Sequence, residues 1–485
     1  MDNKVQNAVR WTLISEIIIK LISPITSMIL ARIFTPKEFG VVATVTMIIS
    51  FTDIFTDAGF QKYIVQHKFA DEKDEDISIC VAFWTNLMIS IVLWMVIRVF
   101  SDQIALIVGN KGMGKVIYIG ALVLPVTSFG SIQTAVFRKK MNFKSISITR
   151  IVIKLIPLLV SAPLAKMGFS FWALIIGNIV GEILNASILT YLSPWKPKLR
   201  YSFMKLLEMI HFSVWTFLET ITSWLVTNLG IFIIGKSFDE YYTGIYKTST
   251  TMVVQVVSII SGATIGVLFS ALSDVQDDKE KFDNIFYSFI RGVGVFAVPL
   301  GFGMLLYGNV VRIILLGSQW QDADLIVSLW GFVMAESVIF NDMSGAVVLS
   351  KGKPQFIMLA NAIQAVLVIP TFYFCGKIGF NVLVVVSSLV RFQLPITQTI
   401  FCCKVSEISF ANIWNNLKYY FLSSFLMVII GVILKHYFST LILEVISIVI
   451  CILFYFSTLL LFKDSRLYLI GCLNKIKNSV LYKRT

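Results

Sequence analysis

Ionisable side chains stand inside the long apolar runs of this sequence, where such groups are rare. The first run holds Glu16 and Lys20, and the second holds Asp53 and Asp57. The members of each pair are four residues apart, so they share one face of a helix. An acid and a base at this spacing can form an ion pair, and two carboxylates can share a cation or a proton. Arg32, at the end of the first run, completes this set of candidates for ion coupling or ion pairing.

Basic side chains deep in the apolar runs form a second set of candidates. A charged group at the centre of a membrane span costs about 2.5–3.5 kcal/mol on insertion scales, so a retained one needs a partner or a water-filled cavity. We expect these cations to line a cavity that binds an anionic group, and ion pairing between helices is the alternative. The candidates are Lys20, Lys154, Lys247, Arg291 and Arg391.

The cysteine and histidine residues show no spacing that would hold a metal ion. The six cysteines include no CxxC pair and the three histidines are scattered. Neither a Ser-His-Asp arrangement nor an HExxH motif is present. We therefore expect no catalytic residue, no metal site and no bound cofactor, and we consider a proton or sodium gradient as the source of energy.

The composition predicts a membrane protein. Hydrophobic residues make up 57% of the chain and charged residues only 14%, and charge-poor apolar runs long enough to span a bilayer recur from end to end. A soluble domain cannot bury that much apolar surface. The net charge of +13 is spread over short loops rather than gathered on one domain, so we expect no nucleic-acid partner.

About fourteen apolar runs are long enough to cross a membrane, which predicts an all-α integral membrane protein. The expected spans lie near residues 11–34, 38–60, 77–99, 115–137, 147–166, 170–192, 209–234, 241–270, 284–306, 323–349, 355–375, 379–401, 417–437 and 440–462.

Two stretches of the chain read alike at one constant offset and indicate an internal duplication. Trp11-Thr12 corresponds to Trp215-Thr216, and Gly40 corresponds to Gly244, without a gap. Six predicted spans separate the two copies, so both halves enter the membrane in the same direction. This predicts two parallel six-helix lobes related by pseudo-two-fold symmetry, with two extra helices at the C-terminal end.

Lys and Arg residues concentrate in alternate loops, including the loop at 138–144. By the positive-inside tendency, this pattern places both termini in the cytoplasm. After Phe462, apolar and basic residues at helical spacing predict an amphipathic helix on the cytoplasmic leaflet. The expected organisation is one lobe at 1–200, a second lobe at 201–404, two further spans at 405–462 and a basic surface segment at 463–485.

The segment from Ala31 to Gln66 resembles the opening of bacterial polysaccharide exporters of the Wzx and teichuronic-acid type. The resemblance rests on Ala31-Arg32, on Thr-Pro-x-x-Phe-Gly from Thr35, and on Asp-x-Gly from Asp57. These exporters belong to the superfamily that holds the multidrug and toxin extrusion (MATE) antiporters and the lipid II flippases. The resemblance implies a MATE-like fold whose two lobes surround a cationic cavity and work by alternating access.

The function that this resemblance implies is that of a flippase. Its expected substrate is a polyprenyl-pyrophosphate-linked oligosaccharide, moved across the bacterial cytoplasmic membrane for O-antigen, capsule or teichuronic-acid-like polysaccharide. Cations at depth suit a pyrophosphate, and the prenyl chain can stay in lipid between the lobes. Membrane lipids and a polysaccharide polymerase are the further partners to expect.

Two other functions stay open. A cation or drug antiporter of the same fold favours an acidic and aromatic cavity, whereas the deep charges here are mostly basic. A membrane-embedded glycan polymerase or ligase needs catalytic residues on a sizeable exterior loop, and the exterior loops predicted here are all short.

Overall fold

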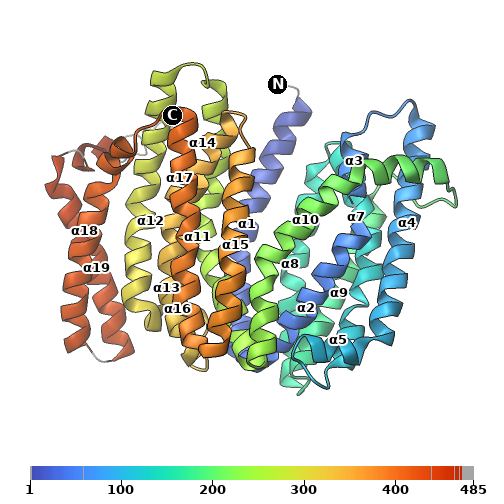
Figure 1. Cartoon of the computed structure of the whole chain (residues 1–485), viewed down its shortest axis with the longest axis horizontal. Coiled ribbons are helices and arrows are strands. Elements are labelled where there is room, and N and C mark those ends of the chain that lie inside the picture. Colours follow the sequence, from blue (N-terminus) through green and yellow to red (C-terminus); the bar gives the residue numbers. More distant parts are fainter. Residues whose placement is uncertain (1–2, 58, 439, 464, 469, 472–485) are drawn as a thin grey trace, which may run out of the picture. The chain divides into compact units, whose positions relative to one another are not determined.

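A computed structural model describes residues 3–57, 59–438, 440–463, 465–468 and 470–471. All the regular elements in these residues are helices (Figure 1). The first ten are α1 (Asn3–Ile33), α2 (Pro36–Asp57), α3 (Phe60–Gln66), α4 (Glu72–Val99), α5 (Ser101–Ile107), α6 (Gly114–Gly120), α7 (Val123–Lys139), α8 (Phe143–Lys166), α9 (Phe171–Leu192) and α10 (Phe203–Ser237). The others are α11 (Glu240–Asp274), α12 (Lys279–Leu315), η1 (Gln321–Ala323), α13 (Asp324–Ser337), η2 (Val338–Met343), α14 (Ser344–Ser350), α15 (Gln355–Ile378), α16 (Phe380–Arg391), α17 (Gln393–Ser406), α18 (Phe410–Tyr437) and α19 (Leu441–Leu461).

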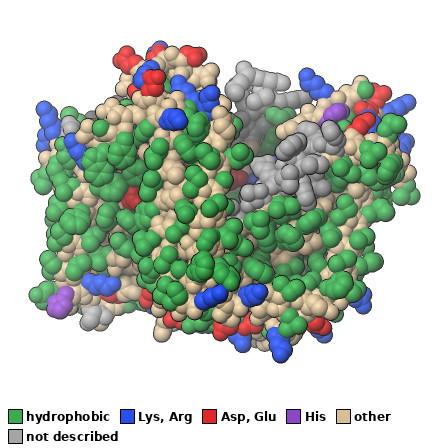
Figure 2. Space-filling view, viewed as in Figure 1, with side chains coloured by type: hydrophobic (Ala, Val, Ile, Leu, Met, Phe, Trp, Pro, Cys, Tyr) green, Lys and Arg blue, Asp and Glu red, His purple; other side chains and the backbone are tan. Residues whose placement is uncertain are grey.

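Thirteen segments of the described chain are long and apolar enough to cross a membrane. Each coincides with a predicted span. The remaining prediction, residues 209–234, lies in α10, which is not among the thirteen. Figure 2 shows apolar side chains along the helices and charged ones mostly near the helix ends, as a bilayer requires. The all-α, multi-pass membrane fold is confirmed, and the total of fourteen spans stays a prediction.

Several of the predicted spans are interrupted. The run at 115–137 is divided between α6 and α7, and the run at 323–349 contains the π-helix η2. The predicted span at 38–60 ends earlier, because α2 stops at Asp57 and Gly59 takes a φ of 83° before α3 begins. Apolar length alone does not report such changes of backbone geometry.

Contacts divide the chain into two compact units, each described here by itself. The first comprises Met1–Gln255, Leu315–Asp322 and Ala365–Ser387, and the second comprises Val256–Ile314, Ala323–Gln364 and Ser388–Thr485. In the first unit α8 packs against α1 and α9, and α10 packs against α2. In the second unit α18 packs against α19, and α17 against η2 and α14. The two lobes expected at 1–200 and 201–404 were defined by the sequence repeat, and this division stays a prediction. The basic segment expected at 463–485 lies largely outside the described residues.

The starts of α2 and α11 have matching chemistry. Glu38 accepts a hydrogen bond from the backbone N–H of Thr35 at 2.7 Å, which together with the Thr35 hydroxyl forms a capping box at the start of α2. Asp239 caps α11 by accepting from the backbone N–H of Tyr242 at 3.1 Å. Thr35 and Asp239 are equivalent positions of the sequence repeat.

Two glycines allow these helix starts to touch. A Cβ at Gly40 would lie 1.7 Å from the carbonyl oxygen of Glu240, and a Cβ at Gly244 would lie 1.8 Å from that of Pro36. All four residues are paired by the repeat, so each copy contacts the other through the same positions. A reciprocal contact of this kind is what a two-fold relation produces. It agrees with the duplication, while the two-fold relation of whole lobes stays a prediction.

Candidate functional site: charged faces of the membrane helices

The helices α1 and α8 meet through polar and charged side chains. The Nη1 of Arg150 on α8 donates to the Oε1 of Glu16 on α1 at 2.8 Å. Nearer the start of both helices, the Ser147 hydroxyl donates to the carbonyl oxygen of Trp11 at 3.2 Å. The later residue of α1 contacts the later residue of α8, so the two helices run parallel. They lie side by side (Figure 1).

Two lysines extend this contact by one helical turn. Lys20 follows Glu16 by four residues, and Lys154 follows Arg150 by four. Because residues four apart share a helix face, the register places the two lysines at the same level. Lys154 is exposed and Lys20 is partly buried. Glu16, Lys20, Arg150 and Lys154 are called the α1–α8 face below.

The α1–α8 face carries three positive groups and one negative group. Both helices lie in segments long and apolar enough to span a membrane, where an ionic group that faces hydrocarbon is costly. Three cations against one carboxylate give the face a net positive charge. Such an excess suits an anionic ligand, since charge-assisted hydrogen bonds to phosphate or carboxylate are among the strong ones.

The structure thus brings together three of the predicted site residues, Glu16, Lys20 and Lys154. It adds Arg150, which the sequence reasoning did not single out. The available signal was the position of Arg150 within the predicted span at 147–166, close to its N-terminal end. Its partner could not be read from the sequence, because the two residues belong to helices far apart along the chain.

Asp53 lies at a different place in the first unit. Its backbone carbonyl accepts from the Thr56 hydroxyl at 2.9 Å, and its Oδ1 lies 3.5 Å from the hydroxyl of Thr127 on α7. The carboxylate therefore faces α7. Asp57 ends α2, but its side chain lies outside the described part of the chain, so a cation or proton shared between Asp53 and Asp57 stays a prediction.

Arg32 and Lys247 also belong to the first unit, at other positions. Arg32 is exposed near the end of α1, where a Cβ on Gly317 would lie 3.4 Å from its Cγ. Lys247 lies on α11, one turn after Gly244, and is partly buried. Their part in ion coupling or substrate binding stays a prediction.

The two predicted arginines of the second unit each lie over an aromatic ring. The Cζ of Arg291 is 5.3 Å from the ring centroid of Tyr468, and the Cζ of Arg391 is 4.2 Å from that of Trp330. Cation–π contacts of this kind hold a guanidinium in place at low desolvation cost. The five predicted cations are divided between the two units, so a single cavity lined by all of them stays a prediction.

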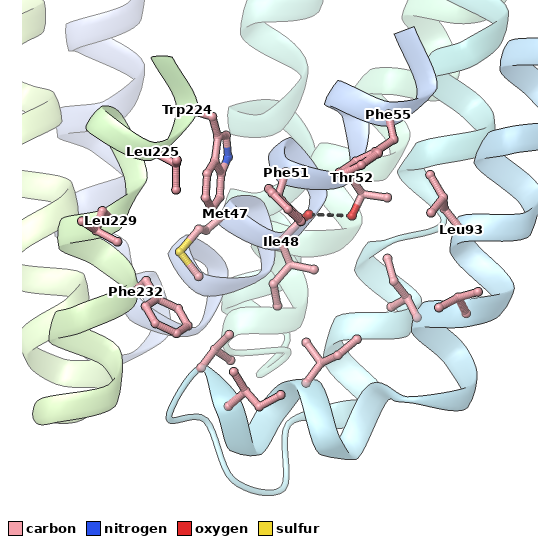
Figure 3. Close-up of a pocket in the computed structure, with 15 residues that line it drawn as sticks. Met47, Ile48, Phe51, Thr52, Phe55, Leu93, Trp224, Leu225, Leu229 and Phe232 are labelled. Carbon is pink, nitrogen blue, oxygen red and sulfur yellow. Dashed lines mark hydrogen bonds between the residues drawn. The ribbon is translucent and has the colours of Figure 1, made fainter. Parts of the chain in front are cut away.

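An apolar cavity of about 590 Å³ lies within the first unit, lined by residues of α2, α4, α5 and α10 (Figure 3). Figure 3 shows Met47, Phe51 and Phe55 on α2 and Trp224 and Leu229 on α10 lining it. All its lining residues except Thr52 are hydrophobic. The cavity was not expected from the sequence, because one of its walls, on α10, lies more than a hundred residues along the chain from the others.

The model of a family described as polysaccharide biosynthesis protein matches residues 29–324, more than half of the chain. The chain belongs to this family. Among its relatives is the lipopolysaccharide biosynthesis protein WzxC of Escherichia coli K12, 22% identical over 385 residues, which are 78% of this chain and 76% of that protein. Another is the succinoglycan biosynthesis transport protein ExoT of Rhizobium meliloti, 23% identical over 66% of this chain and 64% of that protein.

Two solved structures show the fold of this family member. The lipid II flippase MurJ in an inward closed conformation matches 95% of this chain and 100% of its own, with a TM-score of 0.78 and 11% identity. An inward-facing MATE family multidrug resistance transporter matches 82% of this chain and 94% of its own, with a TM-score of 0.61 and 12% identity. The MATE-like fold predicted from the sequence is confirmed.

Proposed function

We propose that this protein is a flippase that moves a polyprenyl-diphosphate-linked oligosaccharide across the cytoplasmic membrane for surface polysaccharide synthesis. The α1–α8 face is the observation that carries this proposal. It carries three cations against one carboxylate, inside segments long and apolar enough to span a membrane. A diphosphate that crosses the bilayer needs such positive charge to offset the loss of its hydration.

The family supplies the rest of the substrate. A sugar chain made at a membrane can be carried on a lipid, and a lipid carrier joined by diphosphate suits both the basic face and the apolar surroundings. MurJ is itself a lipid II flippase, as its name states. Because that likeness shows the fold alone, the substrate class rests on the family and on the charges.

A cation or drug antiporter is the second candidate, since a MATE transporter has the same fold. The charge of the α1–α8 face argues against it, because a cationic substrate would be repelled by the net positive charge. A glycan polymerase or ligase is disfavoured by the relatives, one of which is named a transport protein and one a flippase.

The orientation that we propose places both termini in the cytoplasm of a bacterium, with the loop at 138–144 on the same side. The lipid-linked glycan would enter from the cytoplasmic leaflet and leave at the outer leaflet. A polysaccharide polymerase there would then use it. A proton or sodium gradient would drive the cycle, with Asp53 and Asp57 as candidates for the coupling ion.

A deletion strain tests the proposal. Without this protein, we expect surface polysaccharide to be lost and lipid-linked oligosaccharide to accumulate, protected in intact cells from a glycosidase added outside. A plasmid copy of the gene should restore both. Accumulation of single, unpolymerised repeat units that the external glycosidase does digest would instead indicate a polymerase.

A further inference from the structure

We propose that the cavity between α2, α4, α5 and α10 binds the polyprenyl chain of the lipid-linked substrate. The inference rests on the proposed function and assigns a place to the apolar part of that substrate. The cavity, at about 590 Å³, is within the usual range for ligand sites, which is roughly 300–1,000 Å³. It is distinct from the α1–α8 face, to which it contributes no side chain.

The hydrogen-bond donors at the cavity are already used within the protein. The Thr52 hydroxyl donates to the carbonyl oxygen of Ile48 at 2.8 Å, as the dashed line in Figure 3 shows. The indole N–H of Trp224 donates to the Ser50 hydroxyl at 2.9 Å, and that hydroxyl donates to Met47. A ligand with sugar or phosphate groups would lose its hydration here without compensation. A hydrocarbon chain has no hydrogen bonds to water to lose, and it gains apolar contact with the cavity walls.

The cavity is continuous with the apolar surface that faces the membrane. At its edge, Val96 of α4 and Ile107 of α5 are 45% and 58% exposed. On the same side of α4, Val92 and Met95 are 58% and 53% exposed. A chain that lies in the bilayer can therefore pass from lipid into the cavity without crossing a polar barrier.

The shape of the walls favours a prenyl chain over a straight acyl chain. Phe51 lies between Trp224 and Phe55, with ring centroids 4.8 Å and 5.3 Å from its own. These rings form a broad, rigid wall. A prenyl chain carries a methyl branch and a double bond in each isoprene unit, so it is wider than an acyl chain and presents groups that pack well on aromatic faces.

Photolabelling of the purified full-length protein in lipid nanodiscs tests this inference. The probes are a polyprenyl diphosphate with a diazirine in its chain and a phosphatidylethanolamine with a diazirine in an acyl chain. We expect the polyprenyl probe to label peptides of α2 and α10 around Phe51 and Leu229 several-fold more than the phospholipid probe does. Mass spectrometry of the labelled peptides measures the amount of label from each probe.

Two variants fill the cavity from opposite sides, Leu229→Trp on α10 and Val96→Trp on α4. Each should lower the polyprenyl label on these peptides several-fold, whereas Leu453→Trp at an exposed site of α19 should not. Using two variants keeps the test valid if one of them unfolds. Equal labelling by both probes, or unchanged labelling in both filled variants, would overturn the inference. A protein that still moves lipid-linked glycan but shows this result would leave the proposed function standing.

Discussion

At the scale of residues, the α1–α8 face combines an ion pair with a net positive charge. The Arg150 guanidinium donates to the Glu16 carboxylate at 2.8 Å. With Lys20 and Lys154, the face holds three cations and one carboxylate, and we propose that this excess binds the diphosphate. A sequence reading groups Glu16 with Lys20, because both lie on one helix, and only the packing of α8 shows that Arg150 bonds to the acid.

Replacing Lys20 by Ala should reduce export while leaving the amount of membrane-inserted protein near normal. A hydrogen bond to a charged group contributes about 1.5–3 kcal/mol, so the export rate should fall by roughly tenfold to a hundredfold. Lys20→Arg should keep part of the activity because the charge remains. Surface glycan per cell measures the effect, with Lys353→Ala in an exposed turn as the control. If the Lys20→Ala variant exports glycan at the rate of the unsubstituted protein, the role of this lysine is structural.

Removing one partner of the Glu16 and Arg150 pair should harm stability more than removing both. Arg150→Gln leaves a carboxylate in a membrane helix without its bonded cation, and this is more costly than replacing both groups by neutral ones. We expect the unfolding temperature in detergent to fall for Arg150→Gln and to recover in the double variant with Glu16→Gln. A double variant less stable than Arg150→Gln would show that the pair does not act as a unit.

At the scale of elements, apolar length predicted where the chain crosses the membrane, because a spanning helix must cover its backbone with apolar side chains. The interruptions were missed for a physical reason. The π-helix at Val338–Met343 contains Asn341-Asp342, and the break at Phe392 lies between Arg391 and Gln393. A polar residue within an apolar run does not by itself indicate a change in backbone hydrogen bonding. The contacts of α1 with α8, and the apolar cavity, depend on packing between distant helices and left no local signal.

The reciprocal glycine contact between α2 and α11 gives a prediction at this scale. Gly244→Ala would place a methyl group against the carbonyl oxygen of Pro36, so the helices must separate, at a cost of about 1–3 kcal/mol. Gly266→Ala on the same helix meets nothing within 4 Å and should be neutral or slightly stabilising. Thermal unfolding in detergent compares the two. Equal unfolding temperatures for both variants would mean that the contact at Gly244 is not kept in the membrane.

At the scale of the whole molecule, the proposed orientation rests on the charge of the loops. Single cysteines at Lys140 and Lys111, both exposed, should respond oppositely to an impermeant thiol reagent in intact cells that carry an otherwise cysteine-free protein. We expect labelling at position 111 and protection at position 140, with labelling of both after the membrane is opened. Rapid labelling at position 140 in intact cells would reverse the proposed topology.

Movement of the proposed substrate in a purified system tests the central claim most directly. Vesicles that contain the protein are prepared with a polyprenyl-diphosphate-linked oligosaccharide bearing a fluorescent label and are given a proton or a sodium gradient. An impermeant reductant then quenches the label that it can reach. We predict that the label in both leaflets becomes accessible in vesicles with the protein, more slowly with Lys20→Ala, and that only outer-leaflet label is quenched in empty vesicles. A protected fraction as large with the active protein as in empty vesicles would contradict the assignment as a flippase.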